Sequence, residues 1–289
     1  MWNKIKPYIR EMRPRQYPKN FFIFAPMIFD RQFLNPRSLL VTVIGFVVLC
    51  LLSSGVYTLN DLVDAEADRK HPQKKNRPIA SGQISVRNGR IFCVCLFLSA
   101  YIIAYLLKPD FLLMCLIITA VNLAYSFKLK HLPIIDVMTI GILFILRVRC
   151  GATLTPVKEF SPWIYIVTFM LAMYLGFGKR RAELASVRGS DTRPVLDGYT
   201  LPFLDQLITV LSAMIIISYA LYSFSGPAAV NNSRMLLSLP FVVYGVFRYL
   251  YLIQVKHDGG APEEVLLKDR WLQGAILLYA LSIFYALYL

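Results

Sequence analysis

Charged residues, histidines and cysteines are scarce in this sequence. Only 17% of the 289 residues are charged, three are histidines, and the five cysteines all lie inside apolar runs. The cysteine spacing fits neither a metal site nor a disulfide framework, so we expect these residues to pack as small apolar side chains. The sequence also lacks a glycine-rich phosphate loop, a G-x-S-x-G turn and a recognisable nucleophile–base pair. These absences argue against P-loop nucleotide chemistry and nucleophilic hydrolysis.

Apolar residues are in excess: they make up 57% of the chain, and the mean hydropathy is +0.55. A soluble domain is usually about 45–50% apolar and about 25% charged, so the surplus indicates a protein surrounded by lipid. A membrane-spanning helix needs roughly 20 apolar residues. Nine stretches are candidates: about 20–34, 38–60, 89–107, 110–127, 133–151, 161–178, 201–225, 235–255 and 271–289. The sequence therefore predicts an all-α, polytopic membrane protein with nine transmembrane helices in a single domain over residues 1–289.

The basic residues are unevenly distributed along the chain. The formal net charge is +14, but Lys and Arg occur in short segments between apolar runs, so membrane topology and anionic ligands explain them better than nucleic acid does. With nine spans, 23 of the 31 Lys and Arg residues fall on the side of the N-terminus and five on the opposite side. Because basic loops stay in the cytoplasm, we expect a protein of the cell membrane (inner or plasma membrane), with its N-terminus and active site on the cytoplasmic side.

The most informative segment is the acidic continuation of the second candidate span, Asn60 to Arg69 (NDLVDAEADR). On a helix with 100° per residue, Asp61, Asp64 and Asp68 share an arc of roughly 60°. Carboxylates this close repel one another unless a cation lies among them, and Mg²⁺ prefers oxygen ligands and completes its shell with water and phosphate. A solvated acidic helix end is the alternative interpretation. Because ionisable groups attached to membrane spans usually serve function, we predict that these aspartates bind Mg²⁺ at a catalytic site.

Basic and polar residues around this face are candidates for substrate contacts. Arg77, fixed beside Pro78, is a candidate phosphate ligand. Arg147 lies within a predicted span, where arginine is costly and tends to face a cavity or a counter-charge. Asp136 opens the fifth candidate span and is either a second metal or ribose ligand or a plain N-terminal helix charge. The candidate substrate-binding residues are Lys19, Asn60, Arg77, Tyr125, Lys130, Asp136, Arg147, Lys179, Arg180, Glu183 and Arg193.

Together these features resemble the UbiA superfamily of intramembrane prenyltransferases. The resemblance rests on the N-D-x-x-D-x-x-x-D motif from Asn60 to Asp68, on the loop from Tyr125 to Asp136, and on the nine predicted helices. It implies helices around a central cavity open to the bilayer, in which Mg²⁺ on aspartate-rich helix ends binds a diphosphate substrate. Members that prenylate aromatic rings usually carry a second D-x-x-x-D. Here Asp136 is followed at the fourth position by Ile140.

Four longer strings are similar to the UbiA members that transfer phosphoribose to decaprenyl phosphate: RPRQYPKN (13–20), NDLVDAEADRKHPQKKNRPIASG (60–82), YSFKLKHLPIID (125–136) and GKRRAELASVRGSDTRPVLDGYT (178–200). This narrower resemblance implies an Mg²⁺-dependent pentosyltransferase whose donor is phosphoribosyl diphosphate and whose acceptor is a polyprenyl phosphate. The implied product is a lipid-linked pentose for cell-envelope glycans. The partners are then these two substrates and the lipid bilayer, without nucleic acid, and a homo-oligomer is compatible with the sequence.

Two other functions stay open at this point. A UbiA-type prenyltransferase would use the same aspartates to move a polyprenyl group from its diphosphate to an aromatic acceptor. A transporter or channel for a phosphorylated metabolite would bind its substrate without turnover, and it would tolerate the loss of an aspartate charge. The choice of donor separates the two enzymes, and turnover separates both from the transporter.

Overall fold

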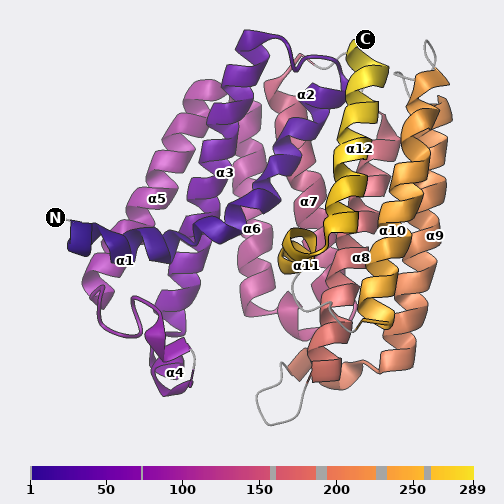
Figure 1. Ribbon diagram of the computed structural model, residues 1–289. Helices are drawn as coiled ribbons and strands as arrows, with labels where there is room; N and C mark the ends of the chain where they lie inside the picture. Colours follow the sequence, from indigo (N-terminus) through magenta and orange to yellow (C-terminus); the bar gives the residue numbers. More distant parts are fainter. Residues whose placement is uncertain (1, 73, 157–160, 187–193, 226–232, 257–261) are drawn as a thin grey trace. The chain divides into compact units, whose positions relative to one another are not determined.

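The computed structural model describes residues 2–72, 74–156, 161–186, 194–225, 233–256 and 262–289. Within these ranges the chain forms α-helices and short 3₁₀ helices and no β-strand, which confirms the predicted all-α class (Figure 1). The helices group into two compact units. The first unit comprises Met1–Ile28, Gln32–Ser126 and Leu146–Val157, and the second comprises Phe29–Arg31, Phe127–Ile145 and Lys158–Leu289.

The first unit is built on α3 (Pro36–Val63), which packs against α1 (Trp2–Met12), η1 (Pro14–Phe24) and α5 (Val86–Leu107). An N-cap starts α3: the side chain of Asn35 accepts hydrogen bonds from the second and third backbone N–H groups of the helix, and proline occupies its first position. The unit also contains most of α2 (Ala25–Phe29), α4 (Ala65–Lys70), η2 (Lys74–Asn76), α6 (Pro109–Phe127) and the C-terminal half of α7 (Ile135–Leu154).

The acidic motif lies where α3 passes into α4. The two helices are separated by Asp64, whose φ of −88° and ψ of 4° fall in the sparsely populated bridge region. Backbone hydrogen bonds continue across the junction, from Asp64 N–H to Asn60 and from Asp68 N–H to Asp64. Asp61 and Asp68 are buried, whereas Asp64 is exposed. The common face predicted for an unbroken helix is therefore kept by the first and last aspartates only.

The second unit is also helical. Its α9 (Leu201–Ser225) packs between α8 (Pro162–Ser186) and α10 (Leu239–Gln254), and α10 also contacts α12 (Arg270–Tyr288). Several aromatic side chains are buried in its core, among them Tyr174, Phe177, Tyr199 and Tyr249. The shorter elements of this unit are η3 (Leu129–His131), the N-terminal half of α7, η4 (Pro194–Gly198), η5 (Ser233–Ser238) and α11 (Pro262–Lys268).

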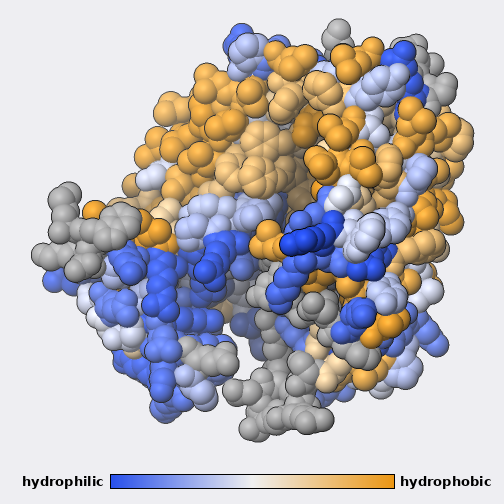
Figure 2. Space-filling model, viewed as in Figure 1, coloured by the Kyte–Doolittle hydropathy of each residue, from blue (hydrophilic) through white to orange (hydrophobic). Residues whose placement is uncertain are grey.

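Seven of the described helices are long and apolar enough to cross a membrane: Pro36–Val63, Val86–Leu107, Pro109–Phe127, Ile135–Leu154, Leu201–Phe224, Arg234–Gln254 and Arg270–Tyr288. In the first unit, hydrophobic residues cover the surface around α5, and hydrophilic residues gather at the end that carries α4 (Figure 2). Exposed apolar side chains of α5, such as Val94, Leu98 and Leu106, suit contact with lipid. The protein is therefore a multi-pass integral membrane protein.

Two of the nine predicted spans differ from this set. Residues 20–34 form the end of η1, the five-residue α2 and turns in place of one spanning helix. Pro14, Pro18 and Pro26 explain this difference, because proline lacks the backbone N–H that an α-helix needs. The other predicted span, 161–178, lies in a 25-residue helix from residue 162 onward, but this helix, α8, continues into the charged sequence KRRAE and is not among the seven. Within the described ranges, seven of the nine predicted transmembrane helices are thus present as long apolar helices.

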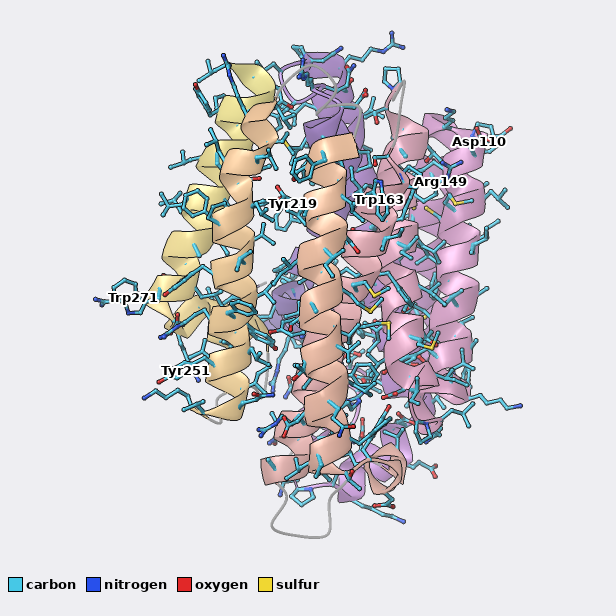
Figure 3. All side chains as sticks on the ribbon, turned by 90° about the vertical axis from the view of Figure 1, so that its right-hand side faces the viewer. Asp110, Arg149, Trp163, Tyr219, Tyr251 and Trp271 are labelled. Atoms are coloured by element: carbon cyan, nitrogen blue, oxygen red, sulfur yellow. The ribbon has the colours of Figure 1, made fainter. Side chains whose placement is uncertain are left out.

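Aromatic side chains accompany the end of the α10 and α12 pair in the second unit. Trp271 projects outward from α12 (Figure 3), and Tyr251 on α10 is also exposed. Arg248 donates hydrogen bonds to both carboxylate oxygens of Asp269. Asp269 also caps α12 by accepting a hydrogen bond from the backbone N–H of Leu272. The hydrogen bond from the Arg248 guanidinium is the main cause that lowers the pKa of Asp269. Tryptophan and tyrosine beside paired charges are typical of the membrane–water boundary, so we infer that this end of the helix pair lies there.

A close backbone approach within the first unit makes Gly151 of α7 hard to replace. A Cβ atom at this position would lie 2.0 Å from the backbone carbonyl oxygen of Ile23, whereas one at Gly274 of α12 would have no neighbour within 4 Å. We therefore predict that Gly151→Ala lowers the free energy of unfolding by about 1–3 kcal/mol or more, as overpacking does. Gly274→Ala is the matched control. Equal melting temperatures of the two purified variants would contradict this packing.

Candidate active site

Two arginines hold the two buried aspartates of the acidic motif. Asp61 is 2% exposed and Asp68 is 3% exposed. The Nη2 atom of Arg13 lies 2.6 Å from each carboxylate oxygen of Asp61. The Nη1 atom of Arg77 donates to Asp61 Oδ1 at 2.9 Å and to Asp68 Oδ2 at 2.7 Å. These four side chains, which we call the Asp61 cluster, tie the last turn of α3 to α4.

The backbone directs both arginines toward the aspartates. Arg13 has a φ of 53°, a left-handed conformation that is uncommon for residues other than glycine. Its guanidinium lies 5.0 Å from the ring centroid of Tyr57, which is one turn before Asp61 on α3. Arg77 closes the turn after η2, with its backbone N–H donating to the carbonyl of Lys74. Arg13 therefore approaches the acidic motif from the segment before it and Arg77 from the segment after it.

The Asp61 cluster suits a divalent cation in its donor chemistry, since carboxylate oxygens are preferred ligands of Mg²⁺. The Nη1 atom of Arg77 already places positive charge between Asp61 and Asp68. Asp64 is exposed, and no three His, Cys, Asp or Glu side chains of the described chain converge as a metal site. A cation shared by Asp61 and Asp68 would therefore have to displace the guanidinium of Arg77. A third acidic side chain would also have to turn toward the cation to complete its ligands.

Other predicted site residues of the first unit make separate contacts. The amide of Asn60 donates to Ser126 Oγ at 3.1 Å, beside the half-buried Tyr125. The ammonium group of Lys19 donates to Gln16 Oε1 at 2.6 Å. These contacts connect α3 to α6 and stabilise η1, and they leave the predicted roles of these residues in substrate binding untested.

Arg147 of α7 belongs to a buried network of polar side chains. It is 9% exposed, and its Nε donates to Asn20 Oδ1 at 3.0 Å. The amide nitrogen of Asn20 donates in turn to Cys50 Sγ and Ser53 Oγ, both at 3.4 Å. This buried arginine thus faces protein groups, as expected for arginine within a span. By contrast, Arg149 is exposed toward the end of α7 (Figure 3).

A second buried cluster surrounds Asp136 in the second unit. Asp136 is fully buried, and its Oδ2 accepts a hydrogen bond from Arg180 Nε at 2.7 Å. Tyr199 donates to Asp136 Oδ1 at 2.8 Å, and Arg180 Nη1 donates to Glu183 Oε2 at 2.8 Å. Burial is the main cause that raises the pKa of Tyr199 above its usual value, so the phenol stays protonated and donates to the carboxylate. Both oxygens of Asp136 are therefore engaged within its own unit.

The structure divides the predicted site residues between the two units. The first unit holds Lys19, Asn60, Asp61, Asp64, Asp68, Arg77, Tyr125 and Arg147. The second unit holds Lys130, Asp136, Lys179, Arg180 and Glu183. Arg193 lies outside the described residues. Arg13 and Tyr199 were not among the candidates, although both lie in the strings that carry the resemblance, at positions 13–20 and 178–200.

Comparison with known proteins accounts for this arrangement of helices. Residues 21–267 match the UbiA prenyltransferase family. The chain belongs to this family. A solved UbiA homologue from Archaeoglobus fulgidus, bound to DMAPP and Mg²⁺, shares the fold, with a TM-score of 0.73 over 96% of this chain and 97% of that chain at 21% identity.

Two relatives in the UbiA family match nearly the whole chain. The decaprenyl-phosphate phosphoribosyltransferase of Corynebacterium glutamicum is 32% identical, over 97% of this chain and 86% of its own length. The enzyme of the same name from Mycolicibacterium smegmatis is 30% identical, over 99% of this chain and 94% of its own length. The predicted membership of the UbiA superfamily is thus confirmed, and so is the narrower resemblance.

Asp136 depends on Arg180 as its charged partner, because breaking a buried ion pair leaves an uncompensated charge. We predict that Arg180→Met destabilises the protein by about 3–5 kcal/mol. The double variant Arg180→Met/Asp136→Asn should recover most of this loss, since it removes the orphaned charge as well. Arg149→Met, at an exposed arginine on α7, is the control. Thermal unfolding in detergent measures all three, and a double variant no more stable than Arg180→Met would contradict the pairing.

Proposed function

We propose that this protein transfers the 5-phosphoribosyl group from phosphoribosyl diphosphate to a polyprenyl phosphate of the decaprenyl type and releases diphosphate. The observation that carries the proposal is the similarity, over nearly the whole chain, to two enzymes named decaprenyl-phosphate phosphoribosyltransferase. The Asp61 cluster supports it, because it combines carboxylates with two arginines where a metal–diphosphate group needs both.

In the proposed reaction, Asp61, Asp64 and Asp68 would together hold Mg²⁺. The chemistry that Mg²⁺ would supply there is to offset the negative charge of the leaving diphosphate. Arg13 and Arg77 would bind diphosphate oxygens and stabilise the charge that develops as the anomeric C–O bond breaks. An oxygen of the lipid phosphate forms the new bond at the anomeric carbon.

The acceptor phosphate is already ionised near neutral pH, so the reaction needs no strong general base. This agrees with a sequence that contains three histidines, none of them in the Asp61 cluster. The polyprenyl tail stays in the bilayer while its head group reacts at the cytoplasmic face of the cell membrane. The product is a lipid-linked phosphopentose that serves as a precursor for cell-envelope arabinan or a related glycan.

The alternative function is a prenyltransferase that moves a polyprenyl group from its diphosphate to an aromatic acceptor, as the name of the family suggests. Two observations favour the ribosyl donor. The second unit contains Asp136 but lacks the second aspartate of a D-x-x-x-D motif, four residues later. Both carboxylate oxygens of Asp136 also accept hydrogen bonds already. The relatives that match almost the entire chain are phosphoribosyltransferases.

Substrate omission separates these functions. Purified protein in lipid nanodiscs would receive Mg²⁺, phosphoribosyl diphosphate and decaprenyl phosphate, together or with one component left out. Diphosphate release and a lipid-linked phosphoribose, detected by mass spectrometry, should require all three components. Turnover of a prenyl diphosphate with an aromatic acid, and none with the ribosyl donor, would favour the alternative. Transport across liposomes without turnover would indicate a transporter.

The aspartates provide a test at the level of single residues. Asp61→Asn, Asp64→Asn and Asp68→Asn should each lower turnover by roughly 100-fold or more, because each removes a charged metal ligand while keeping the side-chain shape. Glu66→Gln, at an exposed position on α4, is the matched control. Expression and monodispersity should be unchanged in all four variants. Near-normal turnover of all three aspartate variants would rule out the proposed metal site.

A further inference from the structure

Ile134 of the second unit adopts a backbone conformation that its own side chain disfavours. Its φ is 69°, in the left-handed region, where a β-branched residue is an outlier. It is the last residue before α7, whose first turn carries the buried Asp136. Such strain persists only where the surrounding structure imposes it, and it is concentrated at functional sites. The contacts that hold Ile134 therefore indicate what the strain serves.

The phenol of Tyr199 holds Ile134 in place. Its oxygen accepts a hydrogen bond from the backbone N–H of Ile134, and its O–H donates to Asp136 Oδ1 at 2.8 Å. Tyr199 is buried, and its ring packs against Phe177 of α8 and Phe203 of α9, with ring centroids 6.3 and 6.5 Å away. Tyr199 therefore fixes the residue before α7 and the first turn of α7 together.

Asp136, the second partner of this phenol, is itself fixed. Arg180 Nε donates to Asp136 Oδ2 at 2.7 Å, and Arg180 Nη1 donates to Glu183 Oε2 at 2.8 Å. The backbone N–H of Asp136 donates to the carbonyl of Leu132 at 3.0 Å. The hydroxyl of Tyr199 thus lies between a strained backbone and a carboxylate that an ion pair holds.

The segment between α6 and α7, residues 128–134, is also held by η4; we call this segment the Lys130 loop. A Cβ atom at Gly198 of η4 would lie 2.5 Å from Cγ of Pro133, so the main chain of η4 lies directly against the proline ring. Lys130 is the middle residue of η3, and its side chain is half-buried. Tyr199 and η4 together therefore set the conformation of the loop that presents Lys130.

We propose that Tyr199 is a positioning residue, which keeps the Lys130 loop in its strained conformation and so directs the ammonium group of Lys130 to a phosphate group of one of the two substrates. Lysine binds phosphate as a point charge on a flexible stem, so its affinity depends on where the backbone places that stem. Without the phenol, the strain at Ile134 drives the loop to another conformation. This inference rests on the proposed function insofar as it takes Lys130 to bind substrate, and it does not depend on the Asp61 cluster.

The test is steady-state kinetics of the full-length protein in nanodiscs, with each substrate varied in turn. Tyr199→Phe keeps the ring and removes both hydrogen bonds of the hydroxyl. We expect KM to rise about three- to tenfold for the substrate that Lys130 binds, with kcat nearly unchanged. A rise for phosphoribosyl diphosphate assigns Lys130 to the donor, and a rise for polyprenyl phosphate assigns it to the acceptor. Tyr219→Phe, at another buried tyrosine whose hydroxyl is hydrogen-bonded to Ser238, is the matched control.

A rescue variant separates positioning from a general loss of stability. Glycine adopts a positive φ without steric cost, and the side chain of Ile134 is exposed, so Ile134→Gly removes the strain with little loss of packing. If Tyr199 acts by holding Ile134, the double variant Tyr199→Phe/Ile134→Gly should have a KM within about twofold of the wild type. A purely structural effect, through the lost hydrogen bond to Asp136, would not be rescued.

A double-variant comparison tests whether Tyr199 acts through Lys130. In a Lys130→Ala background, Tyr199→Phe should cause no further rise in KM, because the group that it positions is gone. A further rise of the same size as in the wild-type background overturns the proposal. If Tyr199→Phe does not purify as a monodisperse protein, Gly198→Ala takes its place, since its Cβ would displace Pro133 and the loop from the other side. A raised KM in Gly198→Ala supports the proposal, and an unchanged KM overturns it.

The outcomes separate this inference from the proposed function. Unchanged KM values in Tyr199→Phe, or a raised KM that Ile134→Gly leaves raised, overturn the role of Tyr199 while turnover of the ribosyl donor still supports the proposed function. Wild-type protein that turns over a prenyl diphosphate and no ribosyl donor overturns the proposed function instead. The same variants measured with the prenyl diphosphate then decide the role of Tyr199, because that substrate also carries phosphate groups.

Discussion

Arg77 places one nitrogen between two carboxylates that would otherwise be buried charges at the end of a membrane span. With Arg13 it makes the interior of the Asp61 cluster neutral, and so allows Asp61 and Asp68 to be buried at all. The same balance suits a substrate made of a metal and a diphosphate. In the proposed reaction Asp61 and Asp68 would hold the metal and Arg13 and Arg77 would bind the diphosphate, so each charged group would keep a partner of opposite sign.

The rest of the molecule follows the same rule for charges near a membrane. In the second unit Asp136 is held by Arg180, Arg181 donates to Asp205 at 2.6 Å, and Arg248 holds the aspartate that caps α12. Ionisable side chains within or beside spans are stable when they pair or line a polar network.

Apolar runs and their lengths were sufficient to predict an all-α membrane protein and the seven spans, because lipid imposes its own length and polarity on a helix. Periodicity placed Asp61 and Asp68 on one face, but it assumed an unbroken helix and so misplaced Asp64, where the backbone leaves the α-helical region. The hydrogen-bonding partners of these aspartates could not be predicted from local sequence patterns. Arg13 lies 48 residues from Asp61, and Tyr199 lies 63 residues from Asp136, and no spacing rule links such distant positions.

The most direct test of the central claim is an anomalous-scattering map of crystals grown with Mn²⁺ and phosphoribosyl diphosphate. The account predicts a manganese peak between the carboxylates of Asp61 and Asp68. It also predicts that the guanidinium of Arg77 has moved from these oxygens to the diphosphate. An Arg77 side chain that still bridges both aspartates, with manganese and donor bound elsewhere in the protein, would contradict it.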